Sequence, residues 1–138
     1  MRPHDTVLLL DADEDRRGRL AYALETKCTV DVVRCGTVTE VAEWLRNHRE
    51  ADVRVLVADA RTPEMLPEFL KAVKLERPEM NTLLIGYDSP EWLETGANVY
   101  IPSGYCSVTN IYERLRILCL RKRGPKRAEN RKRREDAA

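Results

Sequence analysis

The segment VLVADARTPEM, residues 55–65, decides the expected fold. It starts as an unbroken apolar run, which is typical of a buried strand in a parallel sheet. It ends in Thr62 and Pro63, a pair that favours the first turn of a helix. Asp59 lies between the two, where the strand ends. This carboxylate is either a reactive group or the solvated or hydrogen-bonded remnant of one, and both interpretations stay open at this point.

The same alternation of strand and helix continues on both sides of this segment. Thr37 and Glu40 form a capping box at the start of one of the helices. Five β-α pairs predict an α/β fold with a parallel sheet and helices on both faces. Strands are expected at 6–10, 28–34, 53–58, 81–86 and 98–101, and helices at 13–25, 37–48, 62–76, 89–95 and 107–123.

Apolar residues at helical spacing predict the inward faces of the helices. Gly96 is expected to end the short helix at 89–95. The predicted inward residues are Leu20, Ala21 and Leu24 in the first helix, Leu66, Phe69, Leu70 and Val73 in the third, and Val108, Ile111, Tyr112, Leu115 and Cys119 in the last.

The charge distribution divides the chain of 138 residues into two parts. The net charge is +1, but residues 1–120 hold 15 basic and 20 acidic residues, while 121–134 hold nine basic residues and one acid. We therefore expect one domain over 1–123 and a disordered basic tail over 124–138, beginning at the Gly124–Pro125 break. With no signal-peptide pattern and no apolar run of membrane-spanning length, a cytoplasmic protein is expected.

The cysteine and histidine pattern does not predict a metal centre. Four cysteines, at 28, 35, 106 and 119, lack C-x-x-C spacing and are expected to be reduced and partly buried. His4 and His48 are expected at the surface.

Two acids are expected to share one crevice. The first and third predicted strands run into Asp11 and Asp59. In open parallel sheets, sites gather at the carboxyl ends of the strands, at the point where the strand order reverses.

Residues 5–120 resemble the CheY-like response-regulator receiver family. VLLLDADED (7–15) is similar to its first strand with an acidic pair, VADARTPEM (57–65) to its acceptor strand, and GANVYI (96–101) to the lead into its last strand. The resemblance implies a flavodoxin-like sheet of order 2-1-3-4-5. It also implies transfer of a phosphoryl group from a histidine kinase to the acceptor Asp, with Mg²⁺.

The resemblance assigns roles position by position, and several helper groups are replaced. Asp59 matches the phosphoacceptor and Asp11 the first acid of the pair, while Ala12 stands where the second acid is expected. The matches at the switch and conserved-lysine positions are Ile85 for the Ser/Thr, Tyr100 for the aromatic, and Ser103 with Gly104 for the Lys-Pro pair.

These replacements indicate a degenerate acceptor site, as in a pseudo-receiver. Mg²⁺ prefers hard oxygen ligands in octahedral geometry, so any site built on Asp11 and Asp59 is expected to be weak. Asp13 completes the acidic pocket in sequence but is also the natural cap of the first helix. Arg61 or Arg16 could replace the missing lysine, although the sequence does not fix the direction of either side chain.

Several function classes remain open. The favoured one is a stand-alone, non-enzymatic receiver-like module that binds a signalling protein, either a histidine kinase or a downstream effector, with Trp92 and Tyr105 near the centre of the partner face. The first alternative is a working phosphoacceptor at Asp59 in a two-component phosphorelay. The second is nucleic-acid association through weak polyanion binding by residues 121–134. Pairing of the chain with itself also stays open.

Overall fold

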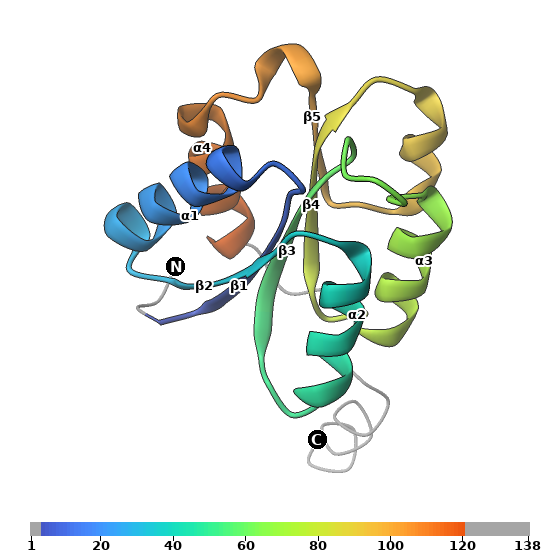
Figure 1. Cartoon of the computed structure of the whole chain (residues 1–138), viewed down its shortest axis with the longest axis horizontal. Coiled ribbons are helices and arrows are strands. Elements are labelled where there is room, and N and C mark those ends of the chain that lie inside the picture. The colour runs from blue at the N-terminus through green and yellow to red at the C-terminus, as the bar shows by residue number, and fades with distance from the viewer. Residues whose placement is uncertain (1–3, 121–138) are drawn as a thin grey trace, which may run out of the picture.

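Five parallel strands form one sheet in the order β2-β1-β3-β4-β5 (Figure 1). The computed structural model describes residues 4–120. The predicted topology is confirmed, whereas the boundary expected at residue 123 and the basic tail lie outside the described residues. The strands are β1 (Thr6–Leu10), β2 (Asp31–Cys35), β3 (Val53–Asp59), β4 (Asn81–Tyr87) and β5 (Val99–Pro102).

Helices cover both faces of the sheet and divide the core into two clusters. One face carries α1 (Glu14–Cys28) and α4 (Val108–Leu120), and the other carries α2 (Val38–Asn47), α3 (Pro67–Glu76) and the 3₁₀ helix η1 (Pro90–Thr95) (Figure 1). A short 3₁₀ turn, η2 (Ser103–Tyr105), follows β5. The central strands are almost entirely buried between these layers, with only Thr6, Arg54 and Tyr87 half-buried, as expected for a parallel sheet.

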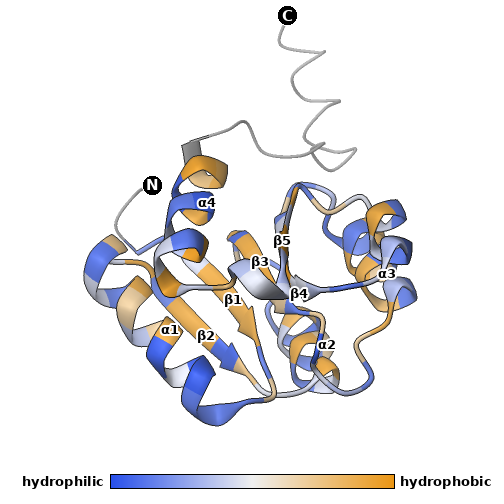
Figure 2. Ribbon diagram, turned by 90° about the horizontal axis from the view of Figure 1, so that it is seen from above, coloured by the Kyte–Doolittle hydropathy of each residue, from blue (hydrophilic) through white to orange (hydrophobic). Residues whose placement is uncertain are grey.

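The sheet is apolar throughout its centre, and the helices turn hydrophilic residues outward (Figure 2). Leu20, Ala21 and Leu24 of α1 are buried, as their spacing predicts. Among residues 4–120, no helix is long and apolar enough to cross a membrane. The four cysteines are free, and all but Cys106 are buried.

Two helix starts confirm the capping pattern in the sequence. The Asp13 carboxylate accepts a hydrogen bond from the Arg16 backbone N–H at 2.9 Å, which caps α1. Thr37 Oγ1 accepts from the Glu40 N–H at 3.1 Å, and the Glu40 carboxylate accepts from the Gly36 N–H at 3.0 Å. The glutamate of the capping box therefore reaches one residue further back than its usual partner.

The start of α3 was predicted five residues too early. Thr62 and Pro63 belong to a turn in which the Met65 N–H donates to the Thr62 carbonyl at 3.0 Å, and Glu64 adopts a left-handed φ of 66°. A left-handed residue interrupts a helix, so α3 begins only at the second proline, Pro67. Leu66, predicted to face inward, is 56% exposed.

Three further expectations need correction. Residues 28–30 do not belong to the second strand, because α1 continues to Cys28 and β2 begins at Asp31. The short helix around Trp92 is a 3₁₀ helix and is ended, as predicted, by left-handed Gly96. Val108, at the first turn of α4, is 37% exposed although its spacing placed it inward.

Candidate functional site

Two buried carboxylates mark the carboxyl edge of the sheet. Asp59 is the last residue of β3 and is 0% exposed; Asp11 directly follows β1 and is 1% exposed. Neighbouring parallel strands β1 and β3 end at the same edge, which brings the two acids together as predicted. Buried carboxylates must be paired or hydrogen-bonded, so their partners define the site.

Asp59 is held by Arg61, two residues further along the chain. The backbone N–H and Nε of Arg61 both donate to Asp59 Oδ1 at 2.9 Å, and Nη2 donates to Oδ2 at 2.6 Å. This bidentate guanidinium–carboxylate geometry is among the strongest hydrogen-bonded arrangements in proteins. Both oxygens of Asp59 are therefore engaged by a cation that belongs to the chain itself.

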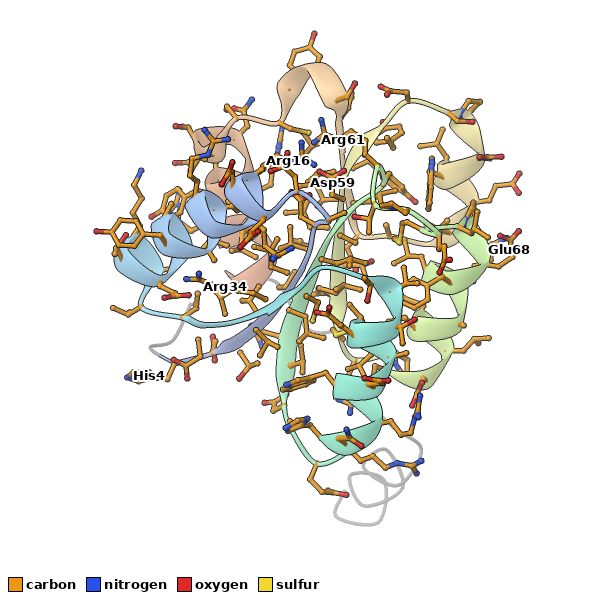
Figure 3. All side chains as sticks on the ribbon, in the orientation of Figure 1. His4, Arg16, Arg34, Asp59, Arg61 and Glu68 are labelled. Carbon is orange, nitrogen blue, oxygen red and sulfur yellow. The ribbon has the colours of Figure 1, made fainter. Side chains whose placement is uncertain are left out.

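Asp11 has an equivalent partner in Arg16 of α1. Arg16 Nε donates to Asp11 Oδ2 at 2.6 Å, and Nη2 donates to Oδ1 at 2.8 Å. The same Nη2 lies 3.5 Å from Asp59 Oδ2, so Arg16 links the two carboxylates. Arg16 is the third residue of its helix, and side chains there lean back toward the helix N-terminus, which directs it toward Asp11. Figure 3 shows Arg16 and Arg61 next to Asp59.

The four charges balance, and hydrogen bonding to the carboxylates fixes the charge state of both arginines. The side-chain hydrogen bond to Asp59 raises the pKa of Arg61, and the corresponding bond to Asp11 raises the pKa of Arg16. A guanidinium that is already always protonated in water thus stays charged at every physiological pH. The cluster of two arginines and two carboxylates therefore has no net charge.

Asp13 does not complete an acidic pocket. Its carboxylate caps α1 and its side chain is 50% exposed, while its backbone N–H donates to Asp11 Oδ1 at 2.9 Å. The hydrogen bond from the Arg16 backbone N–H, together with the Arg16 charge, lowers the pKa of Asp13. Of its two expected roles, Asp13 therefore takes the helix cap.

The residues present do not fit a Mg²⁺ ion. Mg²⁺ requires several oxygen ligands in octahedral geometry, but the oxygens of Asp11 and Asp59 already accept from guanidinium groups, and Ala12 supplies none. The two guanidinium cations beside the carboxylates would also repel the metal. Among residues 4–120, no group of three or more His, Cys, Asp or Glu side chains is arranged to hold a metal.

Tyr100 and Ser103, matched above to the aromatic and lysine positions, both make contacts with the η1 region. The Tyr100 hydroxyl donates to the Leu93 carbonyl at 3.2 Å, and its ring packs edge-on against Tyr87 with centroids 5.4 Å apart. The Ser103 hydroxyl donates to the carboxylate of Asp88, in the turn before η1. None of these contacts involves Asp59.

The position that faces Asp59 from β4 is Gly86. Ile85 pairs in register with Asp59, but its side chain is 1% exposed and packs in the core under α1 and α4. A Cβ on Gly86 would lie 2.9 Å from Asp59 Oδ1. Ile85, expected at the site, therefore packs in the core, and Gly86 is the β4 residue beside Asp59. The sequence signal that was missed is a glycine in an otherwise apolar strand, which often marks a bulge or a close approach.

The two residues expected at a partner face differ in exposure. Tyr105 in η2 is 66% exposed, whereas Trp92 is 7% exposed and packs in the core beside α3. The neighbour of Trp92, Leu93, is 55% exposed. The Trp92 indole is therefore part of the core and is not available to a partner. The exposed apolar side chains in this region belong to Leu93, Tyr105 and Val108.

Comparison with known proteins shows the fold. No family model matches the chain, and no curated protein sequence matches it. Solved structures of receiver domains do. One is the CheY-like receiver domain protein of Methanospirillum hungatei JF-1, with a TM-score of 0.74 and 21% identity over 84% of this chain and 94% of that one. Another is CheY4 of Vibrio cholerae, with a TM-score of 0.69 and 20% identity over 83% and 98%.

A third similar structure is the receiver domain of the Francisella response regulator 1452, with a TM-score of 0.70 and 21% identity over 84% of this chain and 97% of that one. The chain therefore has the CheY-like, flavodoxin-like receiver fold. Its two salt-bridged carboxylates lie side by side at the carboxyl edge of that fold, where the sequence predicted them.

Proposed function

We propose that this protein is a receiver-like signalling module that acts through protein–protein contacts and does not rely on Mg²⁺-dependent phosphorylation of Asp59. The observation that carries the proposal is the bidentate Arg61–Asp59 pair. A phosphoacceptor needs a free carboxylate oxygen as nucleophile, together with cations placed to neutralise the transferred group. Here the local cation is bound to the nucleophile itself.

The cost of releasing Asp59 supports this proposal. Hydrogen bonds to charged groups contribute about 1.5–3 kcal/mol each, so breaking the two side-chain bonds from Arg61 costs roughly 3–6 kcal/mol. At about 1.4 kcal/mol per factor of ten, Mg²⁺ or a phosphoryl group would bind on the order of 10²–10⁴-fold more weakly than at a free carboxylate pair. The partial exposure of Arg61 places the cost toward the lower end.

The experiment is to measure phosphoryl transfer to Asp59 from a small phosphodonor such as acetyl phosphate with Mg²⁺, using the full chain and an Arg61→Ala variant. The proposal expects no acyl phosphate on the native chain. Stoichiometric, Asp59-dependent labelling of the native chain would contradict it. An Asp59→Asn variant is the control for labelling at other residues.

A working phosphoacceptor is the alternative, and one observation favours it. The side chains of Arg16 and Arg61 are 34% and 39% exposed, so both guanidinium groups border solvent and have a route out of the site. If they swing away, Asp59 is left at the strand end of a receiver fold. The labelling experiment above separates the two functions directly.

The partner surface that we propose consists of η1, β5, η2 and the first turn of α4. Exposed apolar side chains at Leu93, Tyr105 and Val108 lie on these elements, and the buried Trp92 side chain packs η1 against the core. Aromatic and apolar anchors of this kind dominate the energetics of many interfaces. The partner that fits is a signalling protein, a histidine kinase or an effector.

Polyanion binding by residues 121–134 remains a separate proposal, because the nine basic residues there lie outside the described residues. Electrostatic binding of this kind falls steeply with salt. We expect the full chain to bind heparin or nucleic acid weakly at low salt, and a chain ending at residue 123 to bind several-fold less. Equal binding by both chains would argue against the tail.

A further inference from the structure

Gly86 occupies a position where the chain has no room for a side chain. It lies in β4 with a left-handed φ of 73°, where the register between β4 and β5 shifts around Ile85 and Tyr87. A Cβ added at Gly86 would lie 2.7 Å from Arg61 Nε and 2.9 Å from Asp59 Oδ1. Real Cβ atoms essentially never come this close to another heavy atom.

We propose that Gly86 is a positioning residue for the Arg61–Asp59 pair. Because glycine has no side chain, the Arg61 guanidinium can occupy the space next to Asp59 that a Cβ at position 86 would take. Arg61 Nε and Asp59 Oδ1 are hydrogen-bonded to each other at 2.9 Å, and both border the missing Cβ. A side chain at position 86 and the guanidinium on Asp59 are therefore mutually exclusive. Any substituent at 86 must displace Arg61 or move the carboxylate away.

The inference rests on this geometry and holds whether or not the chain acts in signalling. It also adds to the proposed function, because the salt bridge at the site then depends on three residues: Asp59, Arg61 and Gly86. Gly86→Ser would therefore separate Arg61 from Asp59 in a single substitution. Changing Arg61 alone would leave a gap beside the acid.

Backbone conformation alone offers a competing explanation for the glycine, and the chain contains a matched control for it. Gly96 adopts nearly the same left-handed φ, 79°, but no atom lies within 4 Å of its virtual Cβ. Gly96→Ala thus measures the cost of a left-handed alanine without any clash. Gly86→Ala adds the clash with Arg61 and Asp59 to the same backbone cost.

The test compares Gly86→Ala and Gly96→Ala in two backgrounds of the full chain: native, and Asp59→Ala/Arg61→Ala. The double background removes the three atoms nearest the new Cβ, which are Asp59 Oδ1 and the Nε and Cζ of Arg61, and leaves no unpaired charge at position 59. In the native background, Gly96→Ala should lower the melting temperature by roughly 2–6 °C, and Gly86→Ala by at least twice as much. In the double background the two losses should become equal.

A second readout follows Arg61 itself. In the native chain the Arg61 Nε–H should give a protected ¹H–¹⁵N cross-peak, because it donates to Asp59. Gly86→Ala should abolish this protection, and Gly96→Ala should leave it unchanged. If Gly86→Ala fails to fold, recovery of folding when it is combined with Asp59→Ala/Arg61→Ala supports the proposal. An excess cost at Gly86 that is the same in both backgrounds, or a failure to fold in both, would overturn it.

Discussion

Arg61 and Asp59 are two residues apart and meet through three hydrogen bonds, one from the Arg61 backbone N–H and two from its guanidinium. Because the contact is so local, closing it costs little loop-closure entropy. Arg16 then ties the pair to Asp11 through its 3.5 Å approach to Asp59 Oδ2. The carboxyl edge of the sheet is consequently a closed, charge-balanced cluster.

Removing either arginine should destabilise the fold, because a buried carboxylate loses its partner. We expect Arg61→Ala and Arg16→Ala each to lower the free energy of unfolding by about 2–4 kcal/mol, measured by urea denaturation. Arg34→Ala is the control, since Arg34 pairs with Glu25 at the surface at 3.1 Å and should cost less than about 1 kcal/mol. Equal losses for all three variants would mean that the inner pairs are as solvated as the outer one.

Asp13 should make stability depend on pH only in the acid range. Its pKa in the folded chain is lowered below the ordinary value of 3.8 by the hydrogen bond from the Arg16 backbone N–H and by the Arg16 charge. A lowered pKa gives stability that is present above the unfolded pKa and is lost as the pH falls through the folded pKa. Melting temperatures measured from pH 6 to pH 2 should therefore fall less steeply for Asp13→Asn, which keeps a cap that does not titrate, than for the native chain.

Trp92 and Leu93 should separate stability from partner binding. Trp92→Ala removes a side chain that is 7% exposed, and should cost about 3–5 kcal/mol in unfolding free energy. Leu93→Ala changes a side chain that is 55% exposed, and should leave the melting temperature within about 2 °C of native. Once a partner is captured, Leu93→Ala should weaken its binding. A thermally silent Trp92→Ala would contradict the burial of the indole.

Mg²⁺ affinity should rise most when Arg61 is removed in addition to restoring the carboxylate at position 12 and the lysine at position 103. Ala12→Asp adds a carboxylate beside Asp11, and Ser103→Lys adds a cation for a phosphoryl group, but both leave Arg61 on Asp59. Adding Arg61→Ala frees the Asp59 oxygens for Mg²⁺. Isothermal titration should show the tightest Mg²⁺ binding in the triple variant. Equal affinities in the double and triple variants would show that Arg61 does not compete with the metal.

The topology could be predicted from the sequence because its signals are local and agree with one another. Apolar runs end at Asp11 and Asp59, and side-chain caps at Asp13 and Thr37 start α1 and α2, so the alternation of strands and helices leaves one natural fold. The start of α3 could not be predicted, since Pro63 and Pro67 both favour a first turn. The left-handed φ of Glu64 decides which proline begins the helix, and a glutamate does not predict a left-handed conformation.

The site was predicted in part for a related reason. Strand-end geometry places Asp11 beside Asp59, because that proximity depends only on the sheet. The directions of Arg16 and Arg61 depend on long, flexible side chains whose rotamers are settled by their surroundings. At the end of β4, an offset of one residue separates Ile85 in the core from Gly86 at the carboxylate. The glycine is the one sequence signal of the register shift there, and it does not by itself fix which residue faces Asp59.

The central claim is that Arg61 keeps Asp59 closed to metal and phosphoryl groups, and amide NMR of the full chain during titration with Mg²⁺ and beryllofluoride tests it most directly. Beryllofluoride mimics a phosphoryl group on an Asp carboxylate. The account predicts no saturable shifts at millimolar Mg²⁺ with beryllofluoride, and an Arg61 Nε–H cross-peak that stays protected throughout. Tight, saturable binding with loss of that cross-peak and shifts across β5 and α4 would contradict the account and make Asp59 a live acceptor.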